Sequence, residues 1–482
     1  MYYDSLIFEI SNKGRVGYSL PKSEFKSYSI PKNLLREVQA ILPEVSELEA
    51  VRHYTNVSTK NFGVEKGFYP LGSCTMKYNP KINQDISNMS QFSLHPYAPS
   101  KSIQGILEIY YETQRILSEL SGLDTYSLNP YAGAHGELVG LMIMRKYHMD
   151  RNDSKRTKVI VPDSAHGTNP ASATIAGFES VEVKSNLDGT VNIESLKLLL
   201  NDEIAGIMLT NPNTAGVFEK DILQIAKLVH DVGGLLYYDG ANLNPILGLA
   251  RPGDMGFDIM HINLHKTFST PHGGGGPGSG PVGVVKHLVK YLPSPVIKKQ
   301  GDLYVIEDSN ETSIGQVTHF YGNIGVVVKA YTYLLTVGKE NMANIGRFSV
   351  LNANYIKESL KTDYLLPIKG ICKHEFVFDG LIDKSHHVTT LDVAKRLLDY
   401  DVHPPTIYFP LTFKESLMIE PTETESKATL DDFINVMRTV AEEARVNPDL
   451  VKGAPYNTVV KRLDEATAAR KPIVKYSDLL EW

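Results

Sequence analysis

The sequence contains little cysteine, no long apolar run and no excess of positive charge. Among 482 residues only Cys74 and Cys372 are cysteines, which excludes a disulfide framework and a cysteine-based zinc site. No apolar run is long enough to span a bilayer, and the N-terminal stretch lacks the basic-then-apolar layout of a secretory signal. The formal net charge of −6 at pH 7 is spread along the chain and gives no basic face for nucleic acid. We therefore expect a cytoplasmic protein that binds neither membrane nor nucleic acid.

The composition is that of a folded protein with more than one domain. Hydrophobic residues make up 42% of the chain and charged residues 22%, close to the averages for globular proteins. The length exceeds what one hydrophobic core usually supports, so a large domain and a smaller one are expected. We predict an N-terminal arm over residues 1–95, rich in Pro, Gly, Asn and Ser, a large α/β domain over 96–335, and a small α+β domain with a tail over 336–482.

Short apolar runs alternate with helical patterns through the predicted large domain. This alternation predicts a mainly parallel sheet that is covered by helices on both faces. The strands expected in the large domain are 159–161, 181–183, 204–209, 235–238, 259–264 and 282–285, and the helices are 102–120, 137–149 and 323–335. A helix over 341–360 leads into the smaller domain, where strands are expected at 375–378 and 417–419 and helices at 391–398 and 430–444. Parallel sheets bind ligands beyond the carboxyl ends of their strands, so the chemistry is sought in the turns that follow these strands.

One lysine, Lys266, lies where the predicted strand over 259–264 gives way to a glycine-rich stretch. His265 and Thr267 flank this lysine and no acidic residue is adjacent, which suits an amine that is kept partly neutral. Such an amine can form a Schiff base with an aldehyde. The alternative is a solvated charge at the end of a strand, which describes most lysines in such a position.

Two further turns carry groups that complement a reactive amine. Asp239 follows the strand at 235–238, where an acid can keep a pyridine nitrogen protonated, although it could simply cap the next turn. The turn Gly133, Ala134, His135 precedes a helix, and the first amide groups of a helix can bind a phosphate. A glycine-containing turn before a helix is weak evidence when it stands alone.

The histidines near these turns permit two interpretations. His166 follows the strand at 159–161 and could stack on a planar ring, although an isolated histidine is more often a hydrogen-bonded loop residue. His261, His265 and His272 could instead suggest a metal site. In a strand-like pattern, however, His261 and His265 would lie roughly 13 Å apart. We therefore predict no metal.

The four signals gain weight because they occur together. A phosphate-binding turn, a stacking histidine, an acid for a ring nitrogen and an amine follow in that order on successive strand ends of one predicted sheet. This order is typical of a fold-type-I pyridoxal-phosphate-dependent transferase, with a mainly parallel sheet of about seven strands covered by helices and a smaller α+β C-terminal domain. In that class two protomers usually share each active site.

Longer motifs point to one family in particular. They include GSCTMK at 72–77, NPYAGAHGEL at 129–138, DSAHGTNPASA at 163–173, DGANLN at 239–244, HKTFSTPHGGGGPGSGP at 265–281, HPPTIYFPL at 403–411 and EPTETESK at 420–427. With these motifs the sequence resembles glycine decarboxylase, the P-protein of the glycine cleavage system, specifically subunit 2 of its split two-subunit form. The resemblance runs nearly end to end.

The resemblance implies roles for the matching positions. Lys266 would form the Schiff base with pyridoxal phosphate, His166 would stack over the ring, and Asp239 would pair with the pyridine nitrogen. No arginine stands out for the carboxylate of the substrate, for which Arg52 and Lys77 are candidates. The remaining implied positions are Gly133, Ala134 and His135 for the phosphate, Ala241 and His265 beside the cofactor, and Ser73, Cys74 and Thr75 near the substrate.

The implied reaction is the decarboxylation of glycine, with transfer of the aminomethyl group to the lipoyl arm of H-protein and release of CO2. The resemblance also implies a partner, subunit 1, in an α2β2 heterotetramer, with the 1–95 arm as a contact. Two alternatives stay open. One is another fold-type-I enzyme, such as an aminotransferase or a different amino-acid decarboxylase, and the other is a non-catalytic scaffold subunit, which the retained Lys266, Asp239 and His166 disfavour.

Overall fold

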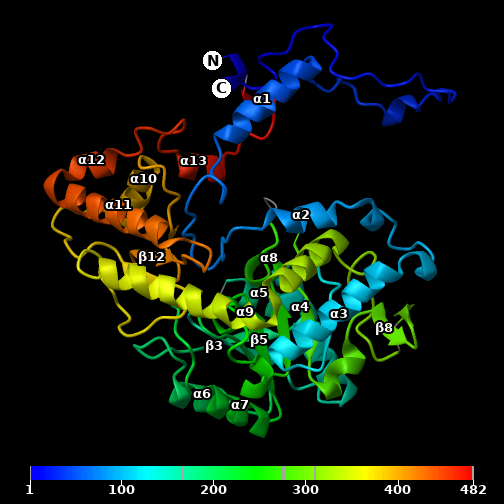
Figure 1. Cartoon of the computed structure of the whole chain (residues 1–482), viewed down its shortest axis with the longest axis vertical. Helices are drawn as coiled ribbons and strands as arrows, with labels where there is room; N and C mark the ends of the chain where they lie inside the picture. The colour runs from blue at the N-terminus through cyan, green and yellow to red at the C-terminus, as the bar shows by residue number, and fades with distance from the viewer. Residues whose placement is uncertain (1, 166, 273–277, 309–310, 480–482) are drawn as a thin grey trace. The chain divides into compact units, whose positions relative to one another are not determined.

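The computed structural model describes residues 2–165, 167–272, 278–308 and 311–479. Their contacts divide the chain into two units, one formed by Met1–Lys66 together with Tyr456–Trp482 and the other by Gly67–Pro455. Each unit is described by itself (Figure 1). Within the described ranges no helix is both long and apolar enough to cross a membrane.

A seven-stranded sheet forms the centre of the larger unit (Figure 1). Its strands are β1 (Thr125–Ser127), β2 (Lys158–Pro162), β3 (Glu179–Val183), β4 (Ile204–Thr210), β5 (Leu235–Gly240), β6 (Ile259–Ile262) and β7 (Val282–Val284). Their order is β1-β7-β6-β5-β4-β2-β3. The five strands β3, β2, β4, β5 and β6 run parallel to one another, whereas β7 is antiparallel to both β6 and β1. The prediction of a mainly parallel sheet is therefore confirmed.

Helices cover both faces of this sheet. They are α3 (Gln104–Ser121), α4 (Gly133–Asp150), α5 (Thr168–Ile175), α6 (Ile193–Leu199), α7 (Ile222–Asp231) and α9 (Ile324–Leu360). Because side chains alternate along a strand, Tyr237 of β5 packs in a core with α4 and α5, and Tyr238 packs in a core with α3, α6, α7 and α9. Both tyrosines are fully buried. The central strands β4 and β5 are thus apolar on both faces, and their polar residues Thr210 and Asp239 lie at the carboxyl ends.

Short elements connect these layers and include several that the sequence pattern did not predict. They are α2 (Lys81–Ser87), η3 (Ser90–Phe92), η4 (Ser100–Ser102), η5 (Asn244–Ile246), η6 (Pro252–Met255), α8 (Leu264–Thr267), η7 (Lys286–Tyr291) and the hairpin of β8 (Val296–Gln300) and β9 (Leu303–Glu307). Strand β1, the hairpin and α8 were not expected. Each is so short that its periodicity carries little signal.

A smaller α+β domain follows within the same unit, as expected for fold type I. Helix α9 enters it after a kink at Gly338, whose backbone is non-helical (φ 70°, ψ 165°). Its antiparallel sheet has the order β10-β12-β11. The elements are β10 (Phe376–Asp379), α10 (Thr390–Leu398), β11 (Thr406–Ile407), β12 (Ser416–Ile419), α11 (Lys427–Val446) and α12 (Pro448–Gly453).

The other unit contains mostly irregular chain. Its elements are η1 (Tyr2–Asp4), η2 (Lys32–Leu34), α1 (Glu47–Thr59), α13 (Glu465–Arg470) and α14 (Tyr476–Leu479). Ser46 begins α1 with a capping box, in which Ser46 and Glu49 each accept a hydrogen bond from the other's backbone N–H. The rings of Phe8 and Tyr476 stack with centroids 4.7 Å apart. The division into 1–95, 96–335 and 336–482 stays a prediction.

Two local expectations at the sheet edge were wrong. The strand expected over 259–264 ends at Ile262, because the next residues form the helical turn α8 after Asn263. A strand-rise distance between His261 and His265 therefore does not apply. The helix expected over 137–149 begins already at Gly133, so the predicted phosphate turn is itself the first turn of α4.

Candidate functional site

The carboxyl ends of β4, β5 and β6 bring polar side chains together at one edge of the sheet. Asp239 on β5 is opposite Thr210 on β4 and opposite His261 on β6 in the strand register. Nε2 of His261 lies 3.3 Å from Oδ1 of Asp239. Asp239 is 1% exposed, so a charge at this position is shielded from water.

Asp239 is held in its ionised form by the groups around it. Its Oδ1 accepts a hydrogen bond from the backbone N–H of Ala241 at 2.9 Å, and its Oδ2 accepts one from Nδ2 of Asn169 at 2.9 Å. Burial by itself would raise the pKa of Asp239, but the charge of His261 and these two donors outweigh it and hold the pKa below its ordinary value. Asp239 is therefore a buried carboxylate available to a cationic group.

Glu137 is linked to Asp239 through the side chain of Asn169, and it is the more basic of the two acids. It accepts hydrogen bonds from Oγ1 of Thr168 (3.0 Å), Nδ2 of Asn169 (3.2 Å) and Oγ of Ser172 (3.1 Å). Burial and the charge of Asp239 raise the pKa of Glu137 to about 7. Asn169 thus joins both acids, and neither Glu137 nor Asn169 was predicted, because neither residue type is distinctive in its motif.

Lys266 lies on the helical turn α8, directly after the end of β6. Its Nζ donates a hydrogen bond to the backbone carbonyl of Ser73 at 2.8 Å. The neighbouring His265 is half-buried, and burial, with the nearby His272 and Lys266, lowers the pKa of His265 to about 3. A neutral imidazole beside Lys266 adds no charge repulsion to an ammonium.

The N-terminus of α4 faces the same edge, because two glycines let it approach closely. A Cβ atom on Gly133 would lie 2.6 Å from Oδ1 of Asn263, and one on Gly136 would lie 2.7 Å from the carbonyl oxygen of Gly280. The amide groups of Gly133, Ala134 and His135 are in the first turn and have no partner within the helix. They can bind an anion, and the helix dipole favours one there.

The loop that contains Ser73, Cys74 and Thr75 covers Lys266. Ser73 and Thr75 have left-handed backbones, with φ of 66° and 52°. The carbonyl of Cys74 accepts a hydrogen bond from Nε2 of His272 at 3.0 Å. Burial raises the pKa of the Cys74 thiol to about 11, so the thiol is protonated at neutral pH.

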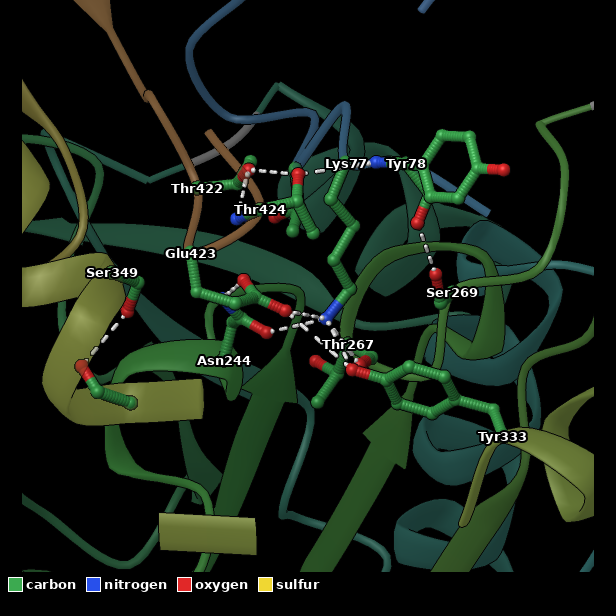
Figure 2. Close-up of polar contacts among 12 residues, drawn as sticks. Lys77, Tyr78, Asn244, Thr267, Ser269, Tyr333, Ser349, Thr422, Glu423 and Thr424 are labelled. Carbon is green, nitrogen blue, oxygen red and sulfur yellow. Dashed lines mark hydrogen bonds and ion pairs between the residues drawn. The ribbon is translucent and has the colours of Figure 1, made fainter. Parts of the chain in front are cut away.

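Lys77 lies at the end of this loop, and its ammonium group is surrounded by hydrogen-bond acceptors (Figure 2). Its Nζ donates to Oδ1 of Asn244 (3.0 Å), the carbonyl of Thr267 (2.7 Å), the hydroxyl of Tyr333 (3.3 Å) and Oε1 of Glu423 (2.8 Å). Burial opposes its charge, but Glu423 and Tyr333 outweigh that cost and raise the pKa of Lys77. Lys77 is thus a buried link between the loop, α8, α9 and the small domain. This argues against Lys77 as the group that binds a substrate carboxylate.

The structure brings most of the predicted site residues to this one edge. Lys266 contacts the Ser73 loop, its charge acts on Asp239, and Ala241 donates to the same acid. His166 lies outside the described residues. Arg52 belongs to the other unit, which is described by itself.

Comparison with known proteins identifies the family. Residues 16–304 match the family described as "Glycine cleavage system P-protein", and residues 345–459 match "Glycine dehydrogenase, C-terminal domain". The chain belongs to the glycine cleavage system P-protein family. Relatives named "Probable glycine dehydrogenase (decarboxylating) subunit 2" from Caldanaerobacter subterraneus subsp. tengcongensis and Alkaliphilus oremlandii are 57% and 59% identical over 480 and 479 residues. Both alignments cover 98% of this chain, and they cover 99% and 98% of the two relatives.

Solved structures agree with this family at the level of the fold. A crystal structure of glycine decarboxylase, the P-protein of the glycine cleavage system, in an inhibitor-bound form, has a TM-score of 0.72 at 19% identity and covers 85% of this chain and 93% of that chain. A glutamate decarboxylase from Lactobacillus brevis has a TM-score of 0.64 at 13% identity, covering 88% and 96%. The P-protein fold is thus fold type I, as predicted.

As a P-protein the chain is an enzyme of glycine decarboxylation, and pyridoxal phosphate is its cofactor. The described residues fit this group. Asp239 is a buried carboxylate for a ring nitrogen, the first turn of α4 is free to bind a phosphate, and Lys266 supplies an amine. Oγ1 of Thr210 and Nδ1 of His265 are buried without a hydrogen-bond partner, as expected of polar atoms that line a binding site. The relatives give no support to an aminotransferase or a scaffold.

Proposed function

We propose that this chain binds pyridoxal phosphate covalently through Lys266, decarboxylates glycine, and passes the aminomethyl group to the lipoyl arm of an H-protein. One observation carries the proposal. Lys266 on α8, Asp239 at the end of β5 and the first turn of α4 converge on one edge of the sheet, where the amine, the ring acid and the phosphate site are all required. Membership of the family supports the decarboxylation of glycine. We propose in addition that the lipoyl arm of an H-protein accepts the aminomethyl group.

Each group has a distinct task in this proposal. Bound pyridoxal phosphate supplies the electron sink for the electron pair that remains when CO2 departs. Asp239, kept ionised by its donors, holds a proton on the ring nitrogen. The first-turn amides of Gly133, Ala134 and His135 bind the phosphate. Lys266 would hold a proton on Nζ, where it donates to the carbonyl of Ser73.

The remaining predicted roles also belong to the proposal. His166 stacks over the ring, and Ala241 and His265 line the cofactor site. Ser73, Cys74 and Thr75 lie in the loop that contacts Lys266, and in this proposal they line the glycine-binding site. Because the Cys74 thiol is protonated, its role in this proposal is to fill space rather than to react.

The proposed assembly contains a partner of the kind that the relatives' name implies. A chain named subunit 2 has a subunit 1, and we propose an α2β2 heterotetramer with it. Residues 1–95 are the proposed contact, because their chain is mostly irregular. The reaction also requires a lipoylated H-protein to reach the Lys266 edge. The cytoplasmic location stays a prediction from the sequence.

Borohydride reduction tests the central claim. The chain is co-expressed with subunit 1, loaded with pyridoxal phosphate, reduced and mapped by peptide mass spectrometry. The pyridoxyl group is expected on Lys266 and is expected to disappear in Lys266→Arg but not in Lys290→Arg, an exposed lysine on η7. Glycine-dependent exchange of labelled bicarbonate that needs lipoylated H-protein then tests the acceptor. A pyridoxyl group on another lysine would refute the assignment, and exchange that is indifferent to H-protein would refute the acceptor.

A further inference from the structure

Two chain segments that are far apart in the sequence, residues 73–78 and 266–272, lie side by side at the Lys266 edge. Four side chains each bind a backbone carbonyl of the opposite segment, and the pairs are Lys266 with Ser73 (2.8 Å), Lys77 with Thr267 (2.7 Å), Ser269 with Tyr78 (2.8 Å) and His272 with Cys74 (3.0 Å). The proposed function uses the first of these contacts and gives no role to Lys77.

The helical turn that carries Lys266 has little stability of its own. Helix α8 is a single turn, and the backbone of Ser269 just beyond it is left-handed, with a φ of 56°. A helix this short is not stable in isolation, and its last carbonyl groups have no N–H partner within the helix. Nζ of Lys77 supplies a donor to the last of them, the carbonyl of Thr267. The position of α8, and of Lys266 with it, therefore depends on contacts from outside the helix.

The small domain fixes the segment from which Lys77 reaches α8. The backbone N–H of Ser73 donates to Oε2 of Glu375 at 2.7 Å. The backbone N–H of Thr75 donates to Oε2 of Glu420 at 2.8 Å. Both glutamates are 0% exposed, and they lie directly before β10 and directly after β12. The 73–78 segment is thus anchored at its beginning, and Lys77 extends from an anchored chain.

The ammonium group of Lys77 joins several elements at once (Figure 2). Besides Thr267 of α8, it binds Asn244 of η5, Tyr333 of α9 and Glu423, which lies between β12 and α11. Nδ2 of Asn244 donates to the second carboxylate oxygen of Glu423 at 3.1 Å, so both oxygens are bound. Because η5 follows β5 and α8 follows β6, one cation connects the turns after two neighbouring strands.

Stability alone does not explain a charged residue at this position. Lys77 is 2% exposed, and a buried ion pair gains little over apolar side chains of similar volume, because both charges lose their hydration. A methionine has a similar length and would fill the same space, but it has no N–H to bind a carbonyl. Lysine adds directed hydrogen bonds, and one of them ends on Thr267, the residue next to Lys266.

We propose that Lys77 is a positioning residue for Lys266. By binding the carbonyl of Thr267 it holds α8 against the 73–78 segment, so that the amine of Lys266 stays at this segment. The carboxylate of Glu423 in turn keeps the ammonium group of Lys77 in place. The inference deepens the proposed function and rests on it only for the consequence in catalysis.

Amide hydrogen exchange of the full chain without the cofactor tests this contact. Lys77→Met removes the donors, so we expect the amides of 264–270 to exchange at least about tenfold faster than in wild type, while those of β4 stay unchanged. The matched control is Lys357→Met, because Lys357 is also buried (1% exposed) and also donates to a backbone carbonyl, that of Gly370, beyond the kink of α9. It should leave 264–270 unchanged. Unchanged exchange in Lys77→Met, or equal acceleration in both variants, would overturn the proposal.

The rate of cofactor attachment separates positioning from a role in stability alone. At saturating pyridoxal phosphate, borohydride is added at a series of times and the pyridoxyl group on Lys266 is quantified. A displaced amine reacts more slowly even in a folded chain, so Lys77→Met should slow the attachment about tenfold or more, and Lys357→Met should not. An unchanged rate in folded Lys77→Met would overturn the proposal. A rise in KM for glycine with unchanged attachment would make Lys77 a substrate-binding residue instead and would overturn it equally.

Native-state hydrogen exchange of the wild-type chain replaces these variants if Lys77→Met does not fold. Small additions of denaturant are used, and the protection of each peptide is followed. The amides of 73–78 and of 264–270 are then expected to lose protection at the same denaturant concentration, because the two segments open as one unit. Openings at clearly different concentrations would overturn the proposal.

Failure of this inference is distinguishable from failure of the proposed function. The exchange experiment needs no cofactor, whereas the borohydride experiment depends on it. Faster exchange of 264–270 in Lys77→Met, together with a pyridoxyl group on a lysine other than Lys266, would refute the role of Lys266 and leave the contact between Lys77 and α8 intact. A pyridoxyl group on Lys266, with unchanged exchange in Lys77→Met, would refute the positioning role alone.

Discussion

The two lysines at the site show how surroundings, rather than residue type, determine chemistry. Lys77 is 2% exposed and its Nζ donates to four acceptors, one of them the carboxylate of Glu423 (Figure 2). Lys266 is half-buried and donates to one backbone carbonyl. A lysine with four acceptors is held in place, whereas one with a single acceptor can move to a reactant. The sequence singled out Lys266 by its place after a strand, and the contacts of Lys77 show that its role is structural.

At the same scale, the Cys74 thiol is expected to be dispensable. Its raised pKa, about 11, keeps it protonated and so a poor nucleophile. Cys74→Ser should therefore keep the rate of glycine-dependent bicarbonate exchange within about twofold of wild type. Cys372→Ser, which changes the other cysteine in the small domain, is the control. A large loss confined to Cys74→Ser would show that the thiol takes part in the reaction.

At the scale of elements, the site depends on how closely α4 approaches the neighbouring strands. The helix begins at Gly133, and its first turn lies against Asn263 and Gly280 because both Gly133 and Gly136 lack a side chain. The dipole and free amides of the first turn act over a short range, so a small displacement weakens them. The proposed phosphate site thus depends on packing at two glycines.

Gly136→Ala is therefore expected to reduce the affinity for pyridoxal phosphate. The added Cβ would lie 2.7 Å from a backbone carbonyl oxygen and 3.0 Å from the Cβ of His261, so α4 must move. We also expect a loss of about 1–3 kcal/mol in the free energy of unfolding. Gly105→Ala in α3 meets no atom within 4 Å and should be neutral or stabilising. Cofactor titration and chemical denaturation check both variants, and equal affinities would contradict the packing argument.

At the scale of the whole molecule, buried neutral histidines link stability to pH. His148 on α4 is 2% exposed, and its Nε2 donates to the carbonyl of Ala205 at 2.9 Å. Burial lowers the pKa of His148 from 6.5 to about 4. The unfolded chain therefore binds a proton between these values that the folded chain does not. The stability that comes from a neutral His148 is present above pH 6.5 and is lost as the pH falls through about 4.

His148→Gln should therefore flatten the acid side of the stability curve. Glutamine can still donate to Ala205 but cannot take up a proton. We expect the wild-type chain to lose at most about 3 kcal/mol more than the variant as the pH is lowered through this range. Chemical denaturation at a series of pH values measures the difference. Parallel curves for the two chains would exclude His148 as a source of acid sensitivity.

The sequence by itself determined the architecture and indicated the residues that are proposed for the site. Strands such as β4 and β5 are continuous apolar runs buried on both faces, and such runs are visible without a structure. Lys266, Asp239 and the Gly133 turn were found because each follows such a strand or precedes a helix. Their positions at strand ends are local properties of the chain, so local patterns reveal them.

The tertiary structure decided the protonation states and the supporting contacts. Ser73 and Glu375 are 302 residues apart, and Thr75 and Glu420 are 345 apart, so no local pattern predicts their pairing. Likewise the ion pair between Lys77 and Glu423 forms only when the small domain packs against α8 and α9. Burial and long-range contacts change the free energy of a charge, and both exist only once the chain is folded.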